Sequence, residues 1–203
     1  MAGRTARTKS GIAGSAVGTS PLVHARTTRN DGIDPKTAPR RPGQKRVVQI
    51  RPVTSSDAVI VAGLRGQLEE IHASLLPGYF RVSTSGRAVF SSGPWSKMWV
   101  ADVDRVVRGY VLAKIVDTPS DPVMIPSRRI HVVEIGVDKP SRRGGLGAQL
   151  MRAALDWGKA EGAEDAVLTV WSDNRAALGL YKTLGFEPIA RVMRRSLASN
   201  VLG

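Results

Sequence analysis

Apolar and polar positions divide the chain near residue 46. Residues 1–45 contain Gly, Ser, Thr and Pro without a helical or a strand period, and they offer little that could pack into a core. Beyond them, apolar residues recur with the periods of strands and helices. The sequence therefore predicts one domain over residues 46–203, preceded by a flexible N-terminal tail over residues 1–45.

The first part of the domain shows the order strand, helix, helix, hairpin. Thr, Ser and Asp residues after the first strand offer N-cap chemistry, and apolar residues then recur at helical spacing as far as Leu76. Gly63 divides this run into two predicted helices. The predicted strands cover residues 47–51, 97–103 and 106–116, and the predicted helices cover residues 54–63 and 64–76.

The second part alternates between strands and helices. Residues 130–137 contain few polar side chains, as expected of a central strand that is covered on both faces. The other predicted elements are helices at 145–160 and 174–184 and strands at 166–171 and 187–197. The complete order, β-α-α-β-β-β-α-β-α-β, predicts an α/β fold in which helices flank a mixed sheet.

The formal charge of +13 is concentrated in the tail, where residues 1–46 have a net charge of +8 and residues 47–203 one of +5. A basic tail attracts nucleic acid, acidic surfaces or anionic lipid without sequence specificity, or it stays solvated and binds nothing in particular. With no acid before Asp31, the tail also has the composition of an organelle transit peptide. These alternatives stay open.

The sequence has no cysteine, which excludes disulfides, cysteine-based metal sites and a cysteine nucleophile. No stretch approaches the roughly 18–20 consecutive apolar residues of a membrane helix, and no apolar segment follows the N-terminal charges as in a secretory signal. We therefore expect a cytoplasmic protein without a metal and without a membrane span.

The candidate chemistry lies between the strand at 130–137 and the next helix. From Val137 to Ala148 the chain reads Val-Asp-Lys-Pro-Ser-Arg-Arg-Gly-Gly-Leu-Gly-Ala. Glycines at a helix start let the backbone approach a ligand, and the free N–H groups and the helix dipole favour an anion there. The segment predicts a phosphate or pyrophosphate cradle, although a glycine-rich turn without a ligand is the alternative. The P-loop and Rossmann patterns fit it less well.

A second motif makes this loop more specific. Arg142, Gly145 and Gly147 match the pattern Arg/Gln-x-x-Gly-x-Gly/Ala, and Asn-x-x-Ala-x-x-x-Tyr runs from Asn174, 27 residues after Gly147, to Tyr181. Together the motifs resemble the GNAT superfamily of acyl-CoA-dependent N-acetyltransferases, in detail over about residues 130–190. The resemblance implies the GNAT fold: a mixed sheet of six to seven strands with a splayed pair at the cofactor site, flanked by four helices.

The resemblance also implies an acyltransferase that moves an acetyl group from acetyl-CoA to a primary amine of a small molecule or protein by direct attack. The strands at 130–137 and 166–171 would splay around the pantetheine arm, and Tyr181 would protonate the departing CoA thiolate; a core aromatic is its alternative role. The implied cofactor-binding residues are Ile135, Gly136, Val137, Arg142, Arg143, Gly144, Gly145, Leu146, Gly147, Ala148, Asn174 and Tyr181.

The reaction needs a neutral amine, whereas an amine with a pKa of about 10 is mostly protonated at neutral pH. Glu134 stands where some GNAT enzymes carry an acid and is the first candidate base; a structural carboxylate paired with Arg is its alternative role. His131 is the second candidate. The Val137 N–H is expected to polarise the thioester carbonyl. Ribosomal-protein alanine acetyltransferases carry Glu where this chain has Thr169, so the resemblance does not predict a ribosomal acceptor.

The acceptor site should come from more variable parts, namely residues 72–80, 81–94 and 117–127. Four aromatic residues could wall a pocket or belong to the core: Tyr79, Phe80, Phe90 and Trp95. No acidic cluster marks a site for a polycation. The motifs leave the acceptor undefined, so a nucleic-acid- or RNP-associated protein and an inactive binding module remain alternatives, and the chain could form a homodimer.

Overall fold

The structure, a computed structural model, describes residues 46–83, 95–120, 122–195 and 197. The tail predicted over residues 1–45 lies outside them. The elements follow in the order β1 (Val48–Pro52), α1 (Ala58–Leu75), β2 (Ser96–Val103), β3 (Val106–Thr118), β4 (Ser127–Val137), α2 (Leu146–Ala160), β5 (Asp165–Leu168) and α3 (Arg175–Thr183). No helix among the described residues is long and apolar enough to cross a membrane.

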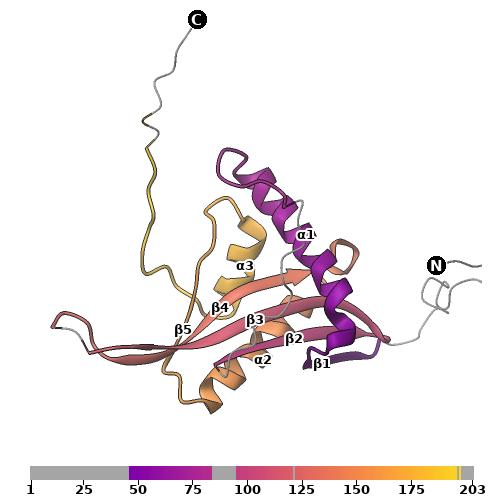
Figure 1. The fold of residues 1–203 in the computed structure, drawn as a ribbon, viewed down its shortest axis with the longest axis horizontal. Coiled ribbons are helices and arrows are strands. Elements are labelled where there is room, and N and C mark those ends of the chain that lie inside the picture. Colours follow the sequence, from indigo (N-terminus) through magenta and orange to yellow (C-terminus); the bar gives the residue numbers. More distant parts are fainter. Residues whose placement is uncertain (1–45, 84–94, 121, 196, 198–203) are drawn as a thin grey trace, which may run out of the picture. The chain divides into compact units, whose positions relative to one another are not determined.

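The five strands form one mixed sheet in the order β1-β2-β3-β4-β5 (Figure 1). Neighbours from β1 to β4 are antiparallel, and β5 runs parallel to β4. The β2–β3 turn places Asp104 and Arg105 at positive φ, as a tight hairpin turn requires. The mixed α/β architecture predicted from the sequence is therefore confirmed.

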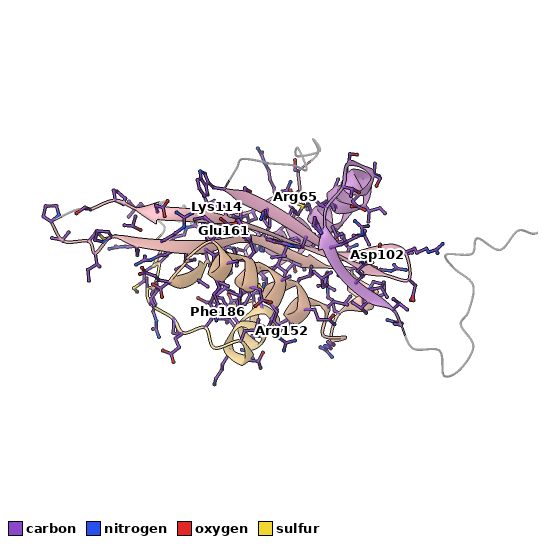
Figure 2. The ribbon with its side chains drawn as sticks, turned by 90° about the horizontal axis from the view of Figure 1, so that it is seen from below. Arg65, Asp102, Lys114, Arg152, Glu161 and Phe186 are labelled. Carbon is purple, nitrogen blue, oxygen red and sulfur yellow. The ribbon has the colours of Figure 1, made fainter. Side chains whose placement is uncertain are left out.

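Two apolar cores cover the two faces of the sheet, because successive side chains of a strand point to opposite faces. On β3, Tyr110 and Leu112 are buried in the core that α1 covers, whereas Val111 and Ala113 are buried in the core beneath α2 and α3. Figure 2 shows α1 on one side of the sheet and α2 on the other. The helix α2 contributes Leu150, Met151 and Ala154, none of which has any exposed surface.

The predicted pair of helices between residues 54 and 76 is wrong, since α1 is continuous from Ala58 to Leu75. A glycine inside a helix costs only about 1 kcal/mol relative to alanine. Val61 and Leu64, on either side of Gly63, are buried in the same core, and this packing outweighs that cost. The described residues therefore contain three α-helices instead of the four that the resemblance implied.

The closing strand predicted at 187–197 is also wrong for the described residues, so the sheet has five strands instead of six to seven. Residues 187–195 adopt no regular structure, and Ile189, Val192 and Met193 are 85–92% exposed. Apolar and β-branched side chains favour a strand only where a neighbouring strand offers an edge and a face to pack on. Pro188 also lacks the N–H group that a ladder needs.

Candidate active site

The strands β4 and β5 separate part-way along the sheet. Their parallel ladder ends where Val132 lies opposite Leu168, yet β4 continues to Val137. The predicted strand at 166–171 therefore ends three residues early, because residues 169–171 leave the sheet. The Asp138 N–H donates to the Arg108 carbonyl at 2.8 Å, on the β3 side. Since backbone groups alternate along a strand, those of Ile135 and Val137 point to the open edge.

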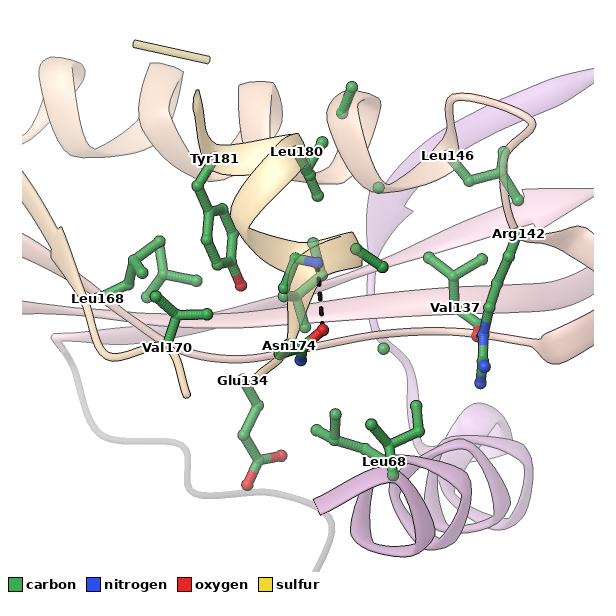
Figure 3. Close-up of a pocket in the computed structure, with 18 of the residues that line it drawn as sticks. Leu68, Glu134, Val137, Arg142, Leu146, Leu168, Val170, Asn174, Leu180 and Tyr181 are labelled. Atoms are coloured by element: carbon green, nitrogen blue, oxygen red, sulfur yellow. Dashed lines mark hydrogen bonds between the residues drawn. The ribbon is translucent and has the colours of Figure 1, made fainter. Parts of the chain in front are cut away.

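A cavity of about 400 Å³ lies at this opening (Figure 3). Its walls come from α1, β4, the loop before α2, the first turn of α2, the segment after β5, and α3. Of the residues predicted to bind the cofactor, all but Gly144 line it: Ile135, Gly136, Val137, Arg142, Arg143, Gly145, Leu146, Gly147, Ala148, Asn174 and Tyr181. The structure thus brings both motifs to one site, while the roles of their residues stay predictions.

The start of α2 has the geometry of an anion cradle. Gly145 is the N-cap residue with φ +80°, a left-handed conformation that glycine adopts readily, and no side chain of the described residues caps the helix. The Gln149 N–H donates to the Gly145 carbonyl at 3.2 Å, so the N–H groups of the three residues between them precede the helical ladder. Arg142 adds positive charge, with its Nε donating to the Val137 carbonyl at 2.9 Å.

Close packing fixes β4 beside the cavity. A Cβ atom at Gly136 would lie 2.6 Å from the Cε1 atom of Tyr110, so only glycine fits there without a shift of the neighbouring ring. Tyr110 itself has no exposed surface, and burial is the main cause that raises its pKa above the ordinary value. Its hydroxyl donates to Glu134 at 3.3 Å, which links the core beneath α1 to the cavity wall.

Asn174 and Tyr181 reach the cavity from α3. Asn174 is the N-cap residue of this helix, and its Oδ1 accepts the Ala177 N–H at 3.2 Å. Tyr181 is 8% exposed, and its ring packs 5.8 Å from that of Phe186. Figure 3 shows the Tyr181 hydroxyl pointing into the cavity, and no described residue forms a hydrogen bond with it. Burial raises the pKa of Tyr181, so its phenol stays protonated at neutral pH.

Glu134 lines the cavity from the other side of β4, and its carboxylate points towards α1 (Figure 3). It forms a salt bridge with Arg65 of α1, with 2.6 Å between Oε2 and Nε. The structural pairing with Arg that the sequence left as an alternative is therefore present. His131, the second candidate base, lies outside the cavity wall. Burial and Lys114 lower its pKa.

The structure adds residues that the sequence did not assign to the site. Leu68 and Ile71 of α1 line the cavity, although their helical spacing indicated only a buried stripe. His72, which begins the acceptor segment predicted at 72–80, lines the cavity as well, and burial lowers its pKa, against the opposing charges of Glu134 and Glu69. Helical periodicity identifies an apolar face, but it does not say whether that face meets a core or a ligand.

Of the segments predicted to form the acceptor site, only part lies at the cavity. Tyr79 and Phe80 pack against Trp171, a residue of the cavity wall. Trp95 lies elsewhere, stacked 5.0 Å from the Arg128 guanidinium, and Phe90 is outside the described residues. None of the described residues of the loop predicted at 117–127 lines the cavity.

Comparison with known proteins decides the family. A sequence model described as the acetyltransferase (GNAT) family matches residues 67–186, which is more than half of the 203 residues. The chain belongs to the GNAT family of acetyltransferases. The resemblance inferred from the two motifs is thereby confirmed.

Individual GNAT relatives share part of the chain. An N-alpha-acetyltransferase of Sulfurisphaera tokodaii is 36% identical over 103 residues, which cover 49% of this chain and 61% of the relative. Human N-acetyltransferase 8B is 32% identical over 92 residues, which cover 45% of this chain and 39% of the relative. The match thus covers less than two thirds of the length of either curated relative.

Solved structures match a larger share of this chain than the curated relatives do. A mutant of the BH1408 protein from Bacillus halodurans is similar with a TM-score of 0.68 and 26% identity, over 74% of this chain and 99% of that one. The aminoglycoside N-acetyltransferase AAC(6')-Iy, solved in complex with CoA, is similar with a TM-score of 0.58 and 21% identity, over 77% of this chain and 99% of that one. The second similarity concerns the fold alone.

Proposed function

We propose that this GNAT protein transfers an acetyl group from acetyl-CoA to a primary amine by direct attack. One observation carries the proposal: the open edge of β4 and the uncapped start of α2 face the same cavity, which Tyr181 and Glu134 also line. The names of the relatives, N-alpha-acetyltransferase and N-acetyltransferase 8B, support transfer to nitrogen. The CoA bound to a structural neighbour supports the donor.

The cofactor would lie along elements that are already in place. The pyrophosphate of acetyl-CoA would bind the N–H groups of the first turn of α2, where the helix dipole and two arginines favour negative charge. These arginines are Arg142 and Arg143, which both line the cavity. The pantetheine arm would pair with the open backbone groups of Ile135 and with the Val137 carbonyl, which can accept a second hydrogen bond beside that of Arg142, along the edge of β4 that β5 leaves free.

The transfer then needs three groups of this chain. The amine nitrogen attacks the thioester carbonyl carbon, and the Val137 N–H would stabilise the charge that develops on the carbonyl oxygen. The carbon–sulfur bond breaks, and the phenol of Tyr181 would give its proton to the departing thiolate. The proton lost by the amine would pass to Glu134, directly or through a water molecule. No metal takes part in this proposed scheme.

Tyr181 and Glu134 lie on different sides of β4, which would separate the side of the departing CoA thiolate from the side of the arriving amine. Tyr181 comes from α3, whereas the Glu134 carboxylate points to the opposite side of β4, towards α1 (Figure 3). The thiolate would leave on the α3 side, and the amine would approach from the α1 side. The nucleic-acid alternative depends on residues 1–45, outside the described part of the chain, and it stays a prediction.

A screen with labelled acetyl-CoA tests the proposal. Peptides with free N-termini, amino acids, polyamines and aminoglycosides would be offered in parallel to the full chain, and acetylated products would be separated and counted. We expect label in the amide of at least one class of amine. Binding of CoA without transfer to any of them would instead favour the inactive binding module.

A further inference from the structure

Four aromatic rings connect the C-terminal end of α1 with the segment that follows β5. The centroid of Phe80 lies 5.3 Å from those of His72 and Tyr79 and 5.0 Å from that of Trp171, and Tyr79 lies 5.5 Å from Trp171. His72 and Trp171 also line the cavity. This aromatic cluster therefore extends the cavity wall on the α1 side, where the amine would enter.

The cluster is not part of the folded core. None of its four residues belongs to either hydrophobic core, including the partly buried side chains packed against them. Tyr79 is 59% exposed, and the other three are half-buried. Rings that are open to the solvent at the mouth of a cavity can bury further apolar surface when a ligand arrives, which stabilises the complex.

The charges around the cavity argue against a polycation. Glu134 is the single carboxylate among the described lining residues, and Arg65 already pairs with it. Arg194 places its guanidinium 5.6 Å from the centre of the Tyr79 ring, which occupies a face that a ligand cation could have used. Burial lowers the pKa of His72 against the charges of Glu134 and Glu69, which keeps its imidazole neutral at neutral pH. Glu69 lies outside the cavity wall, and its Oε2 accepts the Ser83 N–H at 3.0 Å.

We propose that the aromatic cluster is an acceptor subsite that takes an apolar or aromatic group attached to a single reacting amine. The inference rests on the proposed acetyl transfer and names the class of its acceptor. An apolar wall also favours the neutral form of an arriving amine, since burial disfavours its charged form. The cluster would thus both select the acceptor and assist the loss of its proton.

Three ligands test the subsite and do not require the acceptor to be identified first. They are CoA, CoA whose sulfur carries an acetamide of phenethylamine, and CoA whose sulfur carries an acetamide of 1,4-diaminobutane. The affinity of the full chain for each would be measured by calorimetry. We expect the phenethyl conjugate to bind at least about tenfold more tightly than CoA, and the aminobutyl conjugate to bind no more tightly than CoA.

The variant Phe80→Leu keeps an apolar side chain but removes the ring that contacts the other three. We expect it to lose the advantage of the phenethyl conjugate and to bind CoA as the wild type does, because Phe80 does not line the cavity. Val59→Ala, on an 84% exposed residue of α1, serves as the matched control and should keep the advantage.

Any of four results would overturn the subsite. In the wild type, these are a phenethyl conjugate that binds no more tightly than CoA and an aminobutyl conjugate that binds as tightly as the phenethyl one. In Phe80→Leu, they are a retained preference for the phenethyl conjugate and a parallel loss of CoA binding. Failure of CoA itself to bind the wild-type chain would overturn the proposed function together with the subsite. The two failures are therefore distinguishable.

Discussion

The Nε atom of Arg65 lies 2.6 Å from Oε2 of Glu134, which ties α1 to the strand along the open edge of the site. The two side chains are 11% and 17% exposed, so the pair is largely shielded from water. Burial acts to lower the pKa of Arg65, but the hydrogen bond and charge of Glu134 outweigh it and leave the pKa raised. Glu134 is thus held in a fixed place at the cavity wall.

Replacing Glu134 by Gln should show whether its carboxylate has a catalytic or only a structural role. The amide keeps the shape of the side chain but cannot accept the amine proton, so we expect turnover to fall by roughly 10²-fold or more. Unfolding by urea should also show a loss of about 1–3 kcal/mol, because the charge partner of Arg65 is gone. Steady-state turnover and urea denaturation measure the two effects.

Arg65→Gln is the matched control for this experiment, since it breaks the same salt bridge and leaves the carboxylate. It should lose similar stability while turnover falls less than in Glu134→Gln. Normal turnover of Glu134→Gln, with the stability loss alone, would assign Glu134 to the structural role.

Asp57 should make folding sensitive to acid. Two hydrogen bonds from Arg51, at 2.8 and 2.9 Å, are the main cause that lowers the pKa of Asp57. Burial acts to raise this pKa, whereas hydrogen bonds from the Thr54 N–H and hydroxyl lower it further. Because the folded pKa lies below the unfolded value of about 3.9, this stabilisation is present above pH 4 and is lost as the pH falls further. Asp57→Asn should remove about 2 kcal/mol at pH 7.

Urea denaturation at pH 7 and at lower pH measures this effect. The wild type should lose more stability than Asp57→Asn as the pH falls below 4. Asp117→Asn is the control. Asp117 also pairs with an arginine, Arg128, but its side chain is 63% exposed, and such a pair contributes less than about 1 kcal/mol to stability. Equal acid sensitivity of wild type and Asp57→Asn would contradict the prediction.

Tyr181→Phe should slow transfer without unfolding the chain. The ring still packs against Phe186, and the hydroxyl has no hydrogen-bond partner among the described residues, so stability and CoA affinity should stay near the wild-type values. Turnover should fall by about 10²-fold, the low end for loss of a general acid, because a thiolate is a fair leaving group. Thr183→Val, which removes a hydroxyl from an exposed residue of the same helix outside the cavity wall, is the control.

Three quantities decide the role of Tyr181: turnover, CoA affinity and the free energy of unfolding. Normal turnover would make it a core aromatic. A joint collapse of affinity and stability would make its hydroxyl structural.

Much of the C-terminal half of the domain could be predicted because its signals are local. The glycines after Val137, the cap at Asn174 and the spacing to Tyr181 depend on neighbours within a few turns. The predicted helices at 145–160 and 174–184 correspond to α2 and α3 to within about a residue. The predicted cofactor residues other than Gly144 meet at one cavity for the same reason, since a strand, a loop, the start of α2 and one side of α3 place them there.

The errors concern features that depend on distant contacts. A glycine at position 63 suggested a break, but the packing of Val61 and Leu64 keeps α1 continuous. Residues 187–195 have the composition of a strand, yet no strand edge pairs with them in the described structure. The sequence offered an Arg partner as one alternative for Glu134 but did not identify Arg65, because the pair spans 69 residues and no local pattern indicates a contact of that separation.

The central claim is that the start of α2 and the open edge of β4 bind acetyl-CoA. A Cβ atom at Gly147 would lie 3.2 Å from the Cδ2 atom of Leu180, the end of a flexible side chain, so Gly147→Ala should fit after a small shift. Gly147→Glu adds the same Cβ together with a carboxylate inside the cradle. The two variants therefore separate the effect of an added Cβ atom from that of a longer, negatively charged side chain.

Calorimetric titration of CoA into the wild type, Gly147→Ala and Gly147→Glu tests this claim most directly. We expect measurable binding by the wild type, a change of no more than about tenfold in Gly147→Ala, and no detectable binding by Gly147→Glu, because a fixed anion would meet the pyrophosphate. Unchanged affinity in a folded Gly147→Glu variant would contradict the account.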